Sequence, residues 1–282
     1  DKEMYELKIA AWLHDCGKVT TPEYVVDKAT KLETIYDRIH TLDTRFEVLK
    51  RDEEIKVLKK RLKIETDASA SEADKKDALK SLRKKHKDKL VKMEKEMDFI
   101  RATNIGGEFM SGDKKDRVKK IAKYRWKDNG TVKDFLSENE VYNLCIAKGT
   151  LTAEERQIIN DHIVQTIDML QQLPYPNHLK NVPEFAGGHH EKLDGTGYPK
   201  GLTKDEMSVQ AKAMAIADIF EALTAKDRPY KEGKALSMAM RILGFMKNDA
   251  HVDPELFELF VQEKIYLKYG EQYLCPEQLD MD

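Results

Sequence analysis

The sequence has few cysteines, no long apolar run and almost no net charge. Its three cysteines, Cys16, Cys145 and Cys275, are odd in number and far apart, so they form neither a disulfide framework nor a CxxC metal knuckle. No run of about 18 apolar residues is present, so we expect no membrane segment, and the first residues lack a signal-peptide pattern. These absences argue against secreted disulfide scaffolds and membrane proteins and favour a cytoplasmic protein.

Opposite charges nearly cancel, since 49 basic residues face 51 acidic ones for a formal net charge of -2. A dedicated binder of nucleic-acid polymers would usually carry a basic excess, so we expect no such partner. With 282 residues, 40% of them hydrophobic, the chain can bury a core as one large domain or two smaller ones.

Residues 50 to 98 concentrate charge, with 29 Asp, Glu, Lys or Arg in 49 positions. Apolar residues nevertheless recur at steps of three and four, first in Leu32, Ile35, Ile39, Leu42, Phe46 and Leu49, and then, after a slip of six residues, in Ile55, Leu58 and Leu62. After the poor helix formers of residues 66–71, the pattern resumes through Leu79, Leu82, His86, Leu90, Met93, Met97 and Ile100. This predicts two antiparallel helices over about residues 32–102, a protruding coiled-coil hairpin with arms of roughly 40 Å at 1.5 Å per residue.

The remaining chain also has helical patterns. Thr152 and Glu155 form a capping box that opens one helix, apolar through Leu170 and ended before Pro174. A second helix is predicted over residues 209–223, and an apolar face near Leu7 and Leu13 indicates another at the start. Asn129-Gly130 marks a loop, and no segment alternates as a strand does. We therefore expect an all-α fold in which the hairpin is inserted into a compact helical bundle.

Histidines and aspartates occur in unusual settings along these helices. His162 alone would most often be a hydrogen-bonded core residue, and Asp218 alone could be a buried ion-pair member. Together, imidazoles and carboxylates brought from several helices form the ligand set for iron, manganese, zinc or nickel. The sequence thus predicts a metal cluster built from His14, Asp15, His162, His189, His190 and Asp218.

Two further segments fit a phosphate substrate. Residues 189–199 form a turn-rich loop whose glycines permit close backbone approach. Arg228 and Lys231 follow Asp218 by one helical stretch, and an arginine can hold a phosphate with two hydrogen bonds. Each basic residue by itself could equally be ordinary surface charge.

These segments together resemble the HD-GYP phosphodiesterases of bacterial cyclic-dinucleotide signalling. The resemblance rests on His14-Asp15-Cys16-Gly17-Lys18, on Leu151–Arg156 followed by His162, on His189–Pro199, and on Ala217–Tyr230, in the family order. It covers about residues 4–32 and 149–262. It implies an HD-domain helical bundle around two or three divalent ions, iron or manganese.

The resemblance also implies residue roles. His14 and Asp218 would bind one ion, Asp15 would bridge, and the second ion would be held by His162, His189 and His190. Lys18 would act in catalysis with Asp15 by steadying the scissile phosphate or the attacking hydroxide. Contacts with the dinucleotide would come from Tyr198, Glu221, Arg228 and Lys231.

The same resemblance divides the chain. Residues 1–31 and 149–282 would form the two parts of the catalytic domain, residues 32–102 the hairpin, and residues 103–148 a helical connecting segment. The family usually has a further histidine ligand upstream of the HD pair, and none of the 13 residues before His14 is histidine. This favours a truncated chain over an incomplete metal site, with a sensor or receiver domain upstream.

The predicted function is metal-dependent hydrolysis of a 3′–5′ cyclic dinucleotide, cyclic di-GMP first, to pGpG and then GMP if the linear product rebinds. Two alternatives stay open. The substrate could be 3′,3′-cyclic GMP-AMP, or the chain could be a degenerate module that binds a nucleotide or a partner without hydrolysis. The hairpin suits self-association or signal transfer, so we expect a homodimer.

Overall fold

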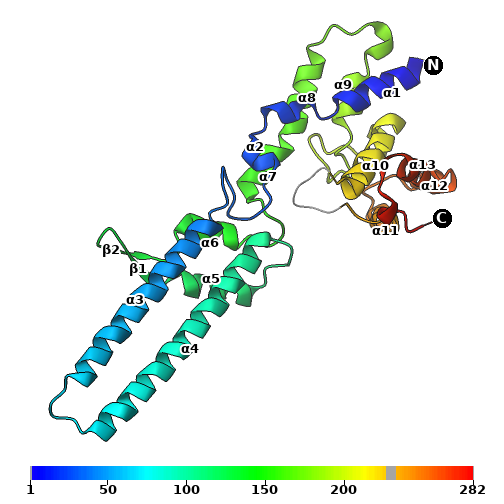
Figure 1. Ribbon diagram of the computed structural model, residues 1–282. Helices are drawn as coiled ribbons and strands as arrows, with labels where there is room; N and C mark the ends of the chain where they lie inside the picture. The colour runs from blue at the N-terminus through cyan, green and yellow to red at the C-terminus, as the bar shows by residue number, and fades with distance from the viewer. Residues whose placement is uncertain (1, 227–232, 282) are drawn as a thin grey trace. The chain divides into compact units, whose positions relative to one another are not determined.

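The computed structural model describes residues 2–226 and 233–281 and divides into two compact units (Figure 1). The site unit comprises residues 1–27 and 153–282, and the hairpin unit comprises residues 28–152. Helices dominate both units, which confirms the predicted helical fold. Within the described ranges, no helix is both long and apolar enough to cross a membrane.

The hairpin unit is built around two long antiparallel helices that lie side by side (Figure 1). Its core lies at their base, where Phe46 of α3 meets Phe135 edge-to-face with ring centroids 4.6 Å apart. The buried side chains Met93, Met97 and Ile100 of α4 complete this core. The elements of the unit are α3 (Ile39–Glu65), α4 (Glu72–Ile105), α5 (Gly112–Ala122), β1 (Arg125–Asp128), β2 (Thr131–Asp134) and α6 (Glu138–Leu144).

The apolar pattern misplaced two parts of α3. The helix begins at Ile39 rather than at Leu32, and Ile35 is 95% exposed in the preceding turn. Further along, Ile55, Leu58 and Leu62 do not continue the seam with α4, because each remains about half exposed or more. The apolar side chains with less exposure in this half are Val57 and Ile64. The slip in the sequence pattern therefore moves the second apolar stripe to another face of the helix.

The expectation of no strand is wrong for residues 125–134. Asn129 and Gly130 both adopt positive φ, 47° and 81°, and they connect two antiparallel strands of four residues each. Such an Asn-Gly turn matches the twist of a two-residue hairpin. The sequence did not predict these strands because most of their side chains are polar and neither strand has a buried face that would produce an alternation of apolar and polar residues.

The hairpin unit extends beyond the segments predicted for the hairpin and its connection. Lys31 is 1% exposed, and its Nζ donates hydrogen bonds to the carbonyls of Leu144 at 3.2 Å and Ile146 at 2.9 Å. The backbone N–H of Leu32 donates to Asn104 Oδ1 at 2.8 Å. Residues 28–31 and 149–152 thus belong with the hairpin unit, four residues beyond each predicted boundary.

We expect the outer half of the hairpin to contribute little to stability. Replacing residues 52–91 with a short Gly/Asn turn should shift the thermal midpoint by only a few degrees, because the core at the base is kept. Lys50 Nζ and Glu94 Oε1 lie 3.7 Å apart, so a short turn can join the arms there. Phe46→Ala, the matched core change, should cost about 3–5 kcal/mol. Calorimetry on both variants checks this, and equal losses would contradict it.

The site unit gathers its helices around α10. Ala10, Phe185 and Met214 belong to one apolar cluster, while Ile216 and Phe220 belong to a second, so α10 joins the two. Asp218 sits on α10 between these positions. The elements are α1 (Lys2–Leu13), η1 (Cys16–Thr20), α2 (Glu23–Val26), α7 (Ala153–Asn160), α8 (His162–Gln171), η2 (Asn177–Leu179), α9 (Val182–Gly187), η3 (Lys204–Glu206), α10 (Val209–Thr224), α11 (Leu236–Asn248), α12 (Pro254–Gln262), α13 (Ile265–Tyr273) and η4 (Pro276–Gln278).

The helix predicted from the Thr152 capping box is divided in the structure. It ends at Asn160, and α8 begins at His162 after a single turn residue, Asp161. The apolar pattern could not show this break because backbone hydrogen bonds continue across it, from Asp161 to Gln157 and from Gln165 to Asp161. The break frees the carbonyl of Ile159 for the side chain of His162.

Candidate metal centre

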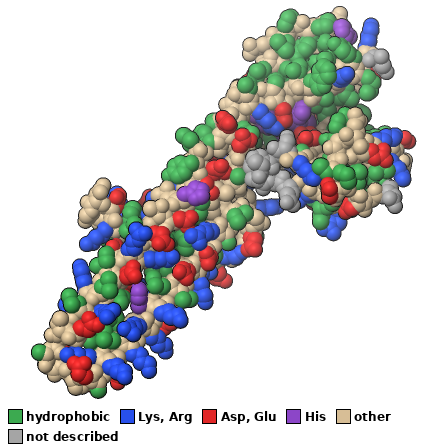
Figure 2. All heavy atoms as spheres, in the orientation of Figure 1, with side chains coloured by type: hydrophobic (Ala, Val, Ile, Leu, Met, Phe, Trp, Pro, Cys, Tyr) green, Lys and Arg blue, Asp and Glu red, His purple; other side chains and the backbone are tan. Residues whose placement is uncertain are grey.

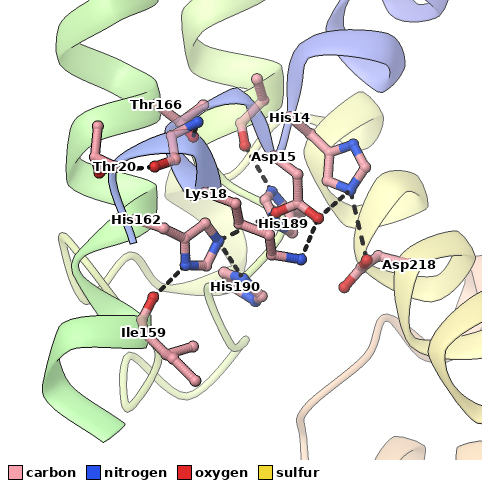
Figure 3. Close-up of polar contacts among 12 residues, drawn as sticks. His14, Asp15, Lys18, Thr20, Ile159, His162, Thr166, His189, His190 and Asp218 are labelled. Carbon is pink, nitrogen blue, oxygen red and sulfur yellow. Dashed lines mark hydrogen bonds and ion pairs between the residues drawn. The ribbon is translucent and has the colours of Figure 1, made fainter. Parts of the chain in front are cut away.

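The turn after α1 is held against α8 by a glycine. The backbone N–H of Gly17 donates to Thr166 Oγ1 at 2.9 Å, and a Cβ at Gly17 would lie only 2.0 Å from the carbonyl oxygen of His162. This close approach brings Asp15 beside His162 (Figure 3). The local sequence therefore needs glycine between the HD pair and Lys18.

Three histidine rings of the site are oriented by the same kind of hydrogen bond. The Nδ1 atoms of His14 and His189 contact the carbonyl oxygens three residues earlier, at 2.7 Å and 2.6 Å, and His162 contacts the Ile159 carbonyl in the same way. A carbonyl can only accept, so the hydrogen of each neutral ring lies on Nδ1. Each Nε2 is thereby left as a lone pair, which is the form in which imidazole binds metals.

The Nε2 atoms of His14 and His162 lie near carboxylates, and that of His162 also lies near His190 (Figure 3). His14 Nε2 lies 3.4 Å from Asp15 Oδ2 and 3.5 Å from Asp218 Oδ1, and His162 Nε2 lies 3.2 Å from Asp15 Oδ1. The Nε2 atoms of His162 and His190 are 3.3 Å apart. Lone pairs that face each other at these distances repel unless a cation, a proton or a metal ion, lies between them.

The potential ligands form two groups that share one residue. Asp15, His162, His189 and His190 make one group, and His14, Asp15 and Asp218 make the other, with all ligand atoms in each group within 4.8 Å of one another. Ligand atoms about 2.1 Å from one ion lie about 3 to 4.2 Å from one another, and the separations of 3.2 to 3.5 Å given above fall within this range.

Two buried atoms support the fit of a metal to these residues. Asp15 Oδ1 and His189 Nε2 are inaccessible to solvent and have no hydrogen-bond partner among the described residues. Burying such atoms without a partner costs free energy. Coordination of a divalent ion would satisfy both, and the imidazole and carboxylate chemistry of the set matches iron, manganese and zinc.

The electrostatics of the cluster favour bound cations. Burial opposes ionisation of Asp15, yet the Lys18 ammonium in contact with its carboxylate, and the His162 ring when it carries a proton on Nε2, hold the pKa of this carboxyl well below the usual range. Burial and the adjacent His189 lower the pKa of His190 to about 3, which keeps this ring neutral and able to coordinate. Burial also lowers the pKa of His189. The site thus presents ionised Asp15 beside neutral His189 and His190 rings, the protonation states that metal ligands need.

The glycine-rich loop is anchored by a buried carboxylate. Glu191, 1% exposed, accepts hydrogen bonds from the backbone N–H groups of Lys200 at 2.7 Å and Leu202 at 2.9 Å. Tyr198 stacks on His190 with ring centroids 4.9 Å apart. Burial, followed by the charges of Asp218 and Asp15, raises the pKa of Tyr198 to about 12, so its hydroxyl stays protonated at neutral pH.

A pocket of about 500 Å³ opens beside the cluster. It is lined by ligand-group residues together with Lys18 and Glu221, so Glu221 lies near the site. Lys18 Nζ contacts Asp15 Oδ2 directly. Sequence patterns had not indicated Met214 and Tyr269 as pocket residues, because Met214 belongs to an ordinary apolar helix and Tyr269 is distant in the chain from the motif residues. The predicted substrate contacts Arg228 and Lys231 lie outside the described residues.

Other supporting groups also had no sequence signal. Thr166 and the carbonyls of Ala11, Ile159 and Ala186 orient the turn and the rings, yet a carbonyl carries no residue-type information. Glu191 stood inside the recognised loop motif, but only its hydrogen bonds identify it as the anchor of that loop.

The comparisons with known proteins agree with this geometry. Residues 138–256 match the HD domain family. A 3′3′-cGAMP-specific phosphodiesterase of Vibrio cholerae is 39% identical over 111 residues, covering 39% of this chain and 23% of the relative. A cyclic di-GMP phosphodiesterase of Pseudomonas aeruginosa is 42% identical over 114 residues, covering 40% and 26%. A cyclic di-GMP phosphodiesterase of Thermotoga maritima is 34% identical over 119 residues, covering 42% and 32%.

The chain spans between 23% and 32% of the length of these three curated relatives. The matched family segment contains His162, His189, His190 and Asp218, while the His14-Asp15 pair precedes it in the chain. The structure brings this pair against the matched segment. Residues 138–256 are therefore similar to an HD domain, and the motifs and relatives of the chain are consistent with the HD-GYP family.

Proposed function

We propose that this chain hydrolyses a 3′–5′ cyclic dinucleotide at the metal centre. The observation that carries the proposal is the pair of ligand groups that share Asp15. Two ions held this way supply an activated water and stabilise charge on the phosphate during in-line displacement. In the reaction, the water oxygen bonds to phosphorus, the bond to O3′ breaks, and O3′ takes a proton. The product is a linear dinucleotide with a 5′-phosphate and a 3′-hydroxyl.

The protein residues around the centre have separate roles in this proposal. His14 and Asp218 would hold one ion, His162, His189 and His190 would hold the second, and Asp15 would serve both. Lys18, whose ammonium contacts Asp15 and lines the pocket, neutralises charge on the scissile phosphate. Iron or manganese suits the mixed set of imidazoles and carboxylates.

Substrate contacts are assigned to the groups at the pocket. Tyr198 keeps its proton near neutral pH and donates a hydrogen bond to a phosphate oxygen. Glu221, which lines the pocket, accepts from the edge of a base. Arg228 and Lys231 are proposed as phosphate contacts from the family resemblance alone, since they fall outside the described residues.

Cyclic di-GMP is the first candidate substrate, with GMP as a second product if the linear dinucleotide rebinds. The named activities of relatives support a second candidate, 3′,3′-cyclic GMP-AMP, because relatives named for each substrate have similar identity to this chain. Both dinucleotides present the same phosphodiester geometry to the metal centre. They differ at one base, so pocket residues such as Glu221 would decide between them.

Anaerobic metal analysis combined with product chromatography tests the function. The purified chain should retain about two divalent ions and convert one or both cyclic dinucleotides to linear products, and chelation should stop turnover. His190→Ala should lose part of the metal and most activity, while His40→Ala, an exposed hairpin histidine, should change neither. Metal retention with binding but no hydrolysis of either nucleotide would instead support the degenerate binding module.

A further inference from the structure

The outer half of α3 has an apolar stripe on a face that stays open to solvent in the described part of the chain. Ile55, Leu58 and Leu62 are 48%, 54% and 61% exposed. Their spacing of three and then four residues is that of a coiled-coil seam, with Arg51 in line one step earlier. Because Val57 and Ile64 of the same half are less exposed, the stripe is separate from the contact with α4. A solvated helix has no need of this second seam.

Charged residues flank the stripe in a regular order. Asp52 and Lys59 lie along one edge, and Glu54 and Arg61 lie along the other, each pair seven residues apart. Among the residues described, Asp52, Glu54 and Lys59 form no ion pair within the chain. Arg61 pairs with Glu65 at 2.8 Å through Nε, which leaves its terminal nitrogens to donate elsewhere. The flanks are therefore available to a partner.

We propose that this stripe binds the same stripe of a second copy of the chain, with the two α3 helices antiparallel. Two-fold symmetry then places Ile55 against the partner's Leu58 and Arg51, through its aliphatic stem, against the partner's Leu62. Such an interface is self-complementary, as closed symmetric dimers require.

The flanking charges select this orientation and register. In the antiparallel arrangement, Glu54 faces the partner's Arg61 and Asp52 faces the partner's Lys59. Symmetry doubles each pair, which gives four attractive contacts and no repulsive one. In a parallel arrangement, Glu54 would still face the partner's Lys59, but Glu47 would face the partner's Asp52. Charges at these flanking positions determine partner choice and orientation in coiled coils.

The outer face of α4 does not suit a second copy. Lys76, Lys80, Arg83, Lys84 and Lys87 are exposed at helical spacing on one face, and none forms an ion pair in the described part of the chain. Figure 2 shows Lys and Arg side chains along this edge of the hairpin. Two such faces would repel. The α3 stripe is short, about 17 Å at 1.5 Å per residue, so we expect a weak, concentration-dependent dimer.

Charge exchange on the full chain tests the register. Sedimentation velocity from about 5 to 300 μM, a range set by the interface size, should show a monomer–dimer equilibrium. Glu54→Arg and Arg61→Glu should each weaken association at least about tenfold, because each creates two repulsive contacts. The double variant E54R/R61E should restore it. Lys63→Glu, a charge reversal on α3 outside both flanks, is the matched control and should have a small effect.

A further variant tests whether the dimer forms through this stripe or through another surface. Leu58→Ala removes an exposed side chain, so the fold should persist by circular dichroism while association weakens. A chain that stays monomeric throughout, a dimer unaffected by Leu58→Ala, or a double charge exchange that fails to restore association would each overturn the proposal. Metal content should not change in any of these variants, because no residue of the stripe belongs to the metal centre, so the outcome is independent of the proposed hydrolysis.

Discussion

Replacing Asp15 with alanine is expected to abolish metal retention and to reduce hydrolysis of cyclic dinucleotides by at least about a thousandfold. Asp15 is the one residue common to both ligand groups, and its two oxygens face His14 and His162 separately. Its loss therefore disconnects the two groups, whereas loss of His190 affects only one. Metal content measured together with initial rates checks this prediction.

Thermal unfolding with and without added metal separates a ligand role from a structural one. A ligand that binds only the folded state raises the free energy of unfolding, so metal should stabilise the unaltered chain and leave Asp15→Ala unshifted. Asp168→Ala, an exposed aspartate on α8, is the control and should respond like the unaltered chain. Full metal content with normal turnover in Asp15→Ala would show that the cluster is assigned wrongly.

Gly17→Ala should disrupt the site without altering any ligand. The added Cβ would lie 2.0 Å from the His162 carbonyl oxygen and 2.6 Å from the Thr166 backbone nitrogen, and both obstacles are backbone atoms of α8 that cannot rotate away. The turn must therefore move off α8, which breaks the hydrogen bond from Gly17 to Thr166. We expect a loss of about 3 kcal/mol of stability and at least about tenfold weaker metal binding.

Gly244→Ala is the matched control for this substitution. Gly244 lies inside α11, and a Cβ added there would meet no described atom within 4 Å, so alanine should stabilise the chain by up to about 1 kcal/mol. Denaturant unfolding and metal titration of both variants measure the contrast. If Gly17→Ala retained the stability and metal affinity of the unaltered chain, the close packing of η1 on α8 would not hold in solution.

The chemistry of the site was readable from the sequence because it depends on residue type. Histidines and aspartates on apolar helices are costly unless they have partners, so their presence on several such segments indicated a cluster. The glycines of the loop before Tyr198 marked a place where backbones approach closely, whereas the close packing of Gly17 was visible only in the structure. Helices were also predictable wherever an apolar face repeats at the helical period, as over residues 209–223.

The boundaries of the elements, and the helix faces that pack against each other, were harder to predict from the sequence. The apolar spacing extended the predicted helix from Ile39 back to Leu32, although these residues form a turn. Side chains hold this turn, and one of its hydrogen bonds runs from Leu32 N–H to Asn104, which is 72 residues later in the chain. The strands at Arg125–Asp128 and Thr131–Asp134 have no buried face to produce alternation. Which face of α3 meets α4 depends on packing at the hairpin base, so the outward stripe became visible only from exposed fractions.

The sequence by itself determined which residue types this protein offers for metal chemistry and the order in which they occur. Tertiary structure decided which atoms meet: that Asp15 joins both ligand groups, that carbonyls three residues earlier direct the Nε2 lone pairs of His14, His162 and His189 inward, and that Glu191 anchors the loop. The physical reason is that ligand identity is a local property of a side chain. Coordination depends on distances between segments as much as 204 residues apart, such as His14 and Asp218, and only the packed fold sets those distances.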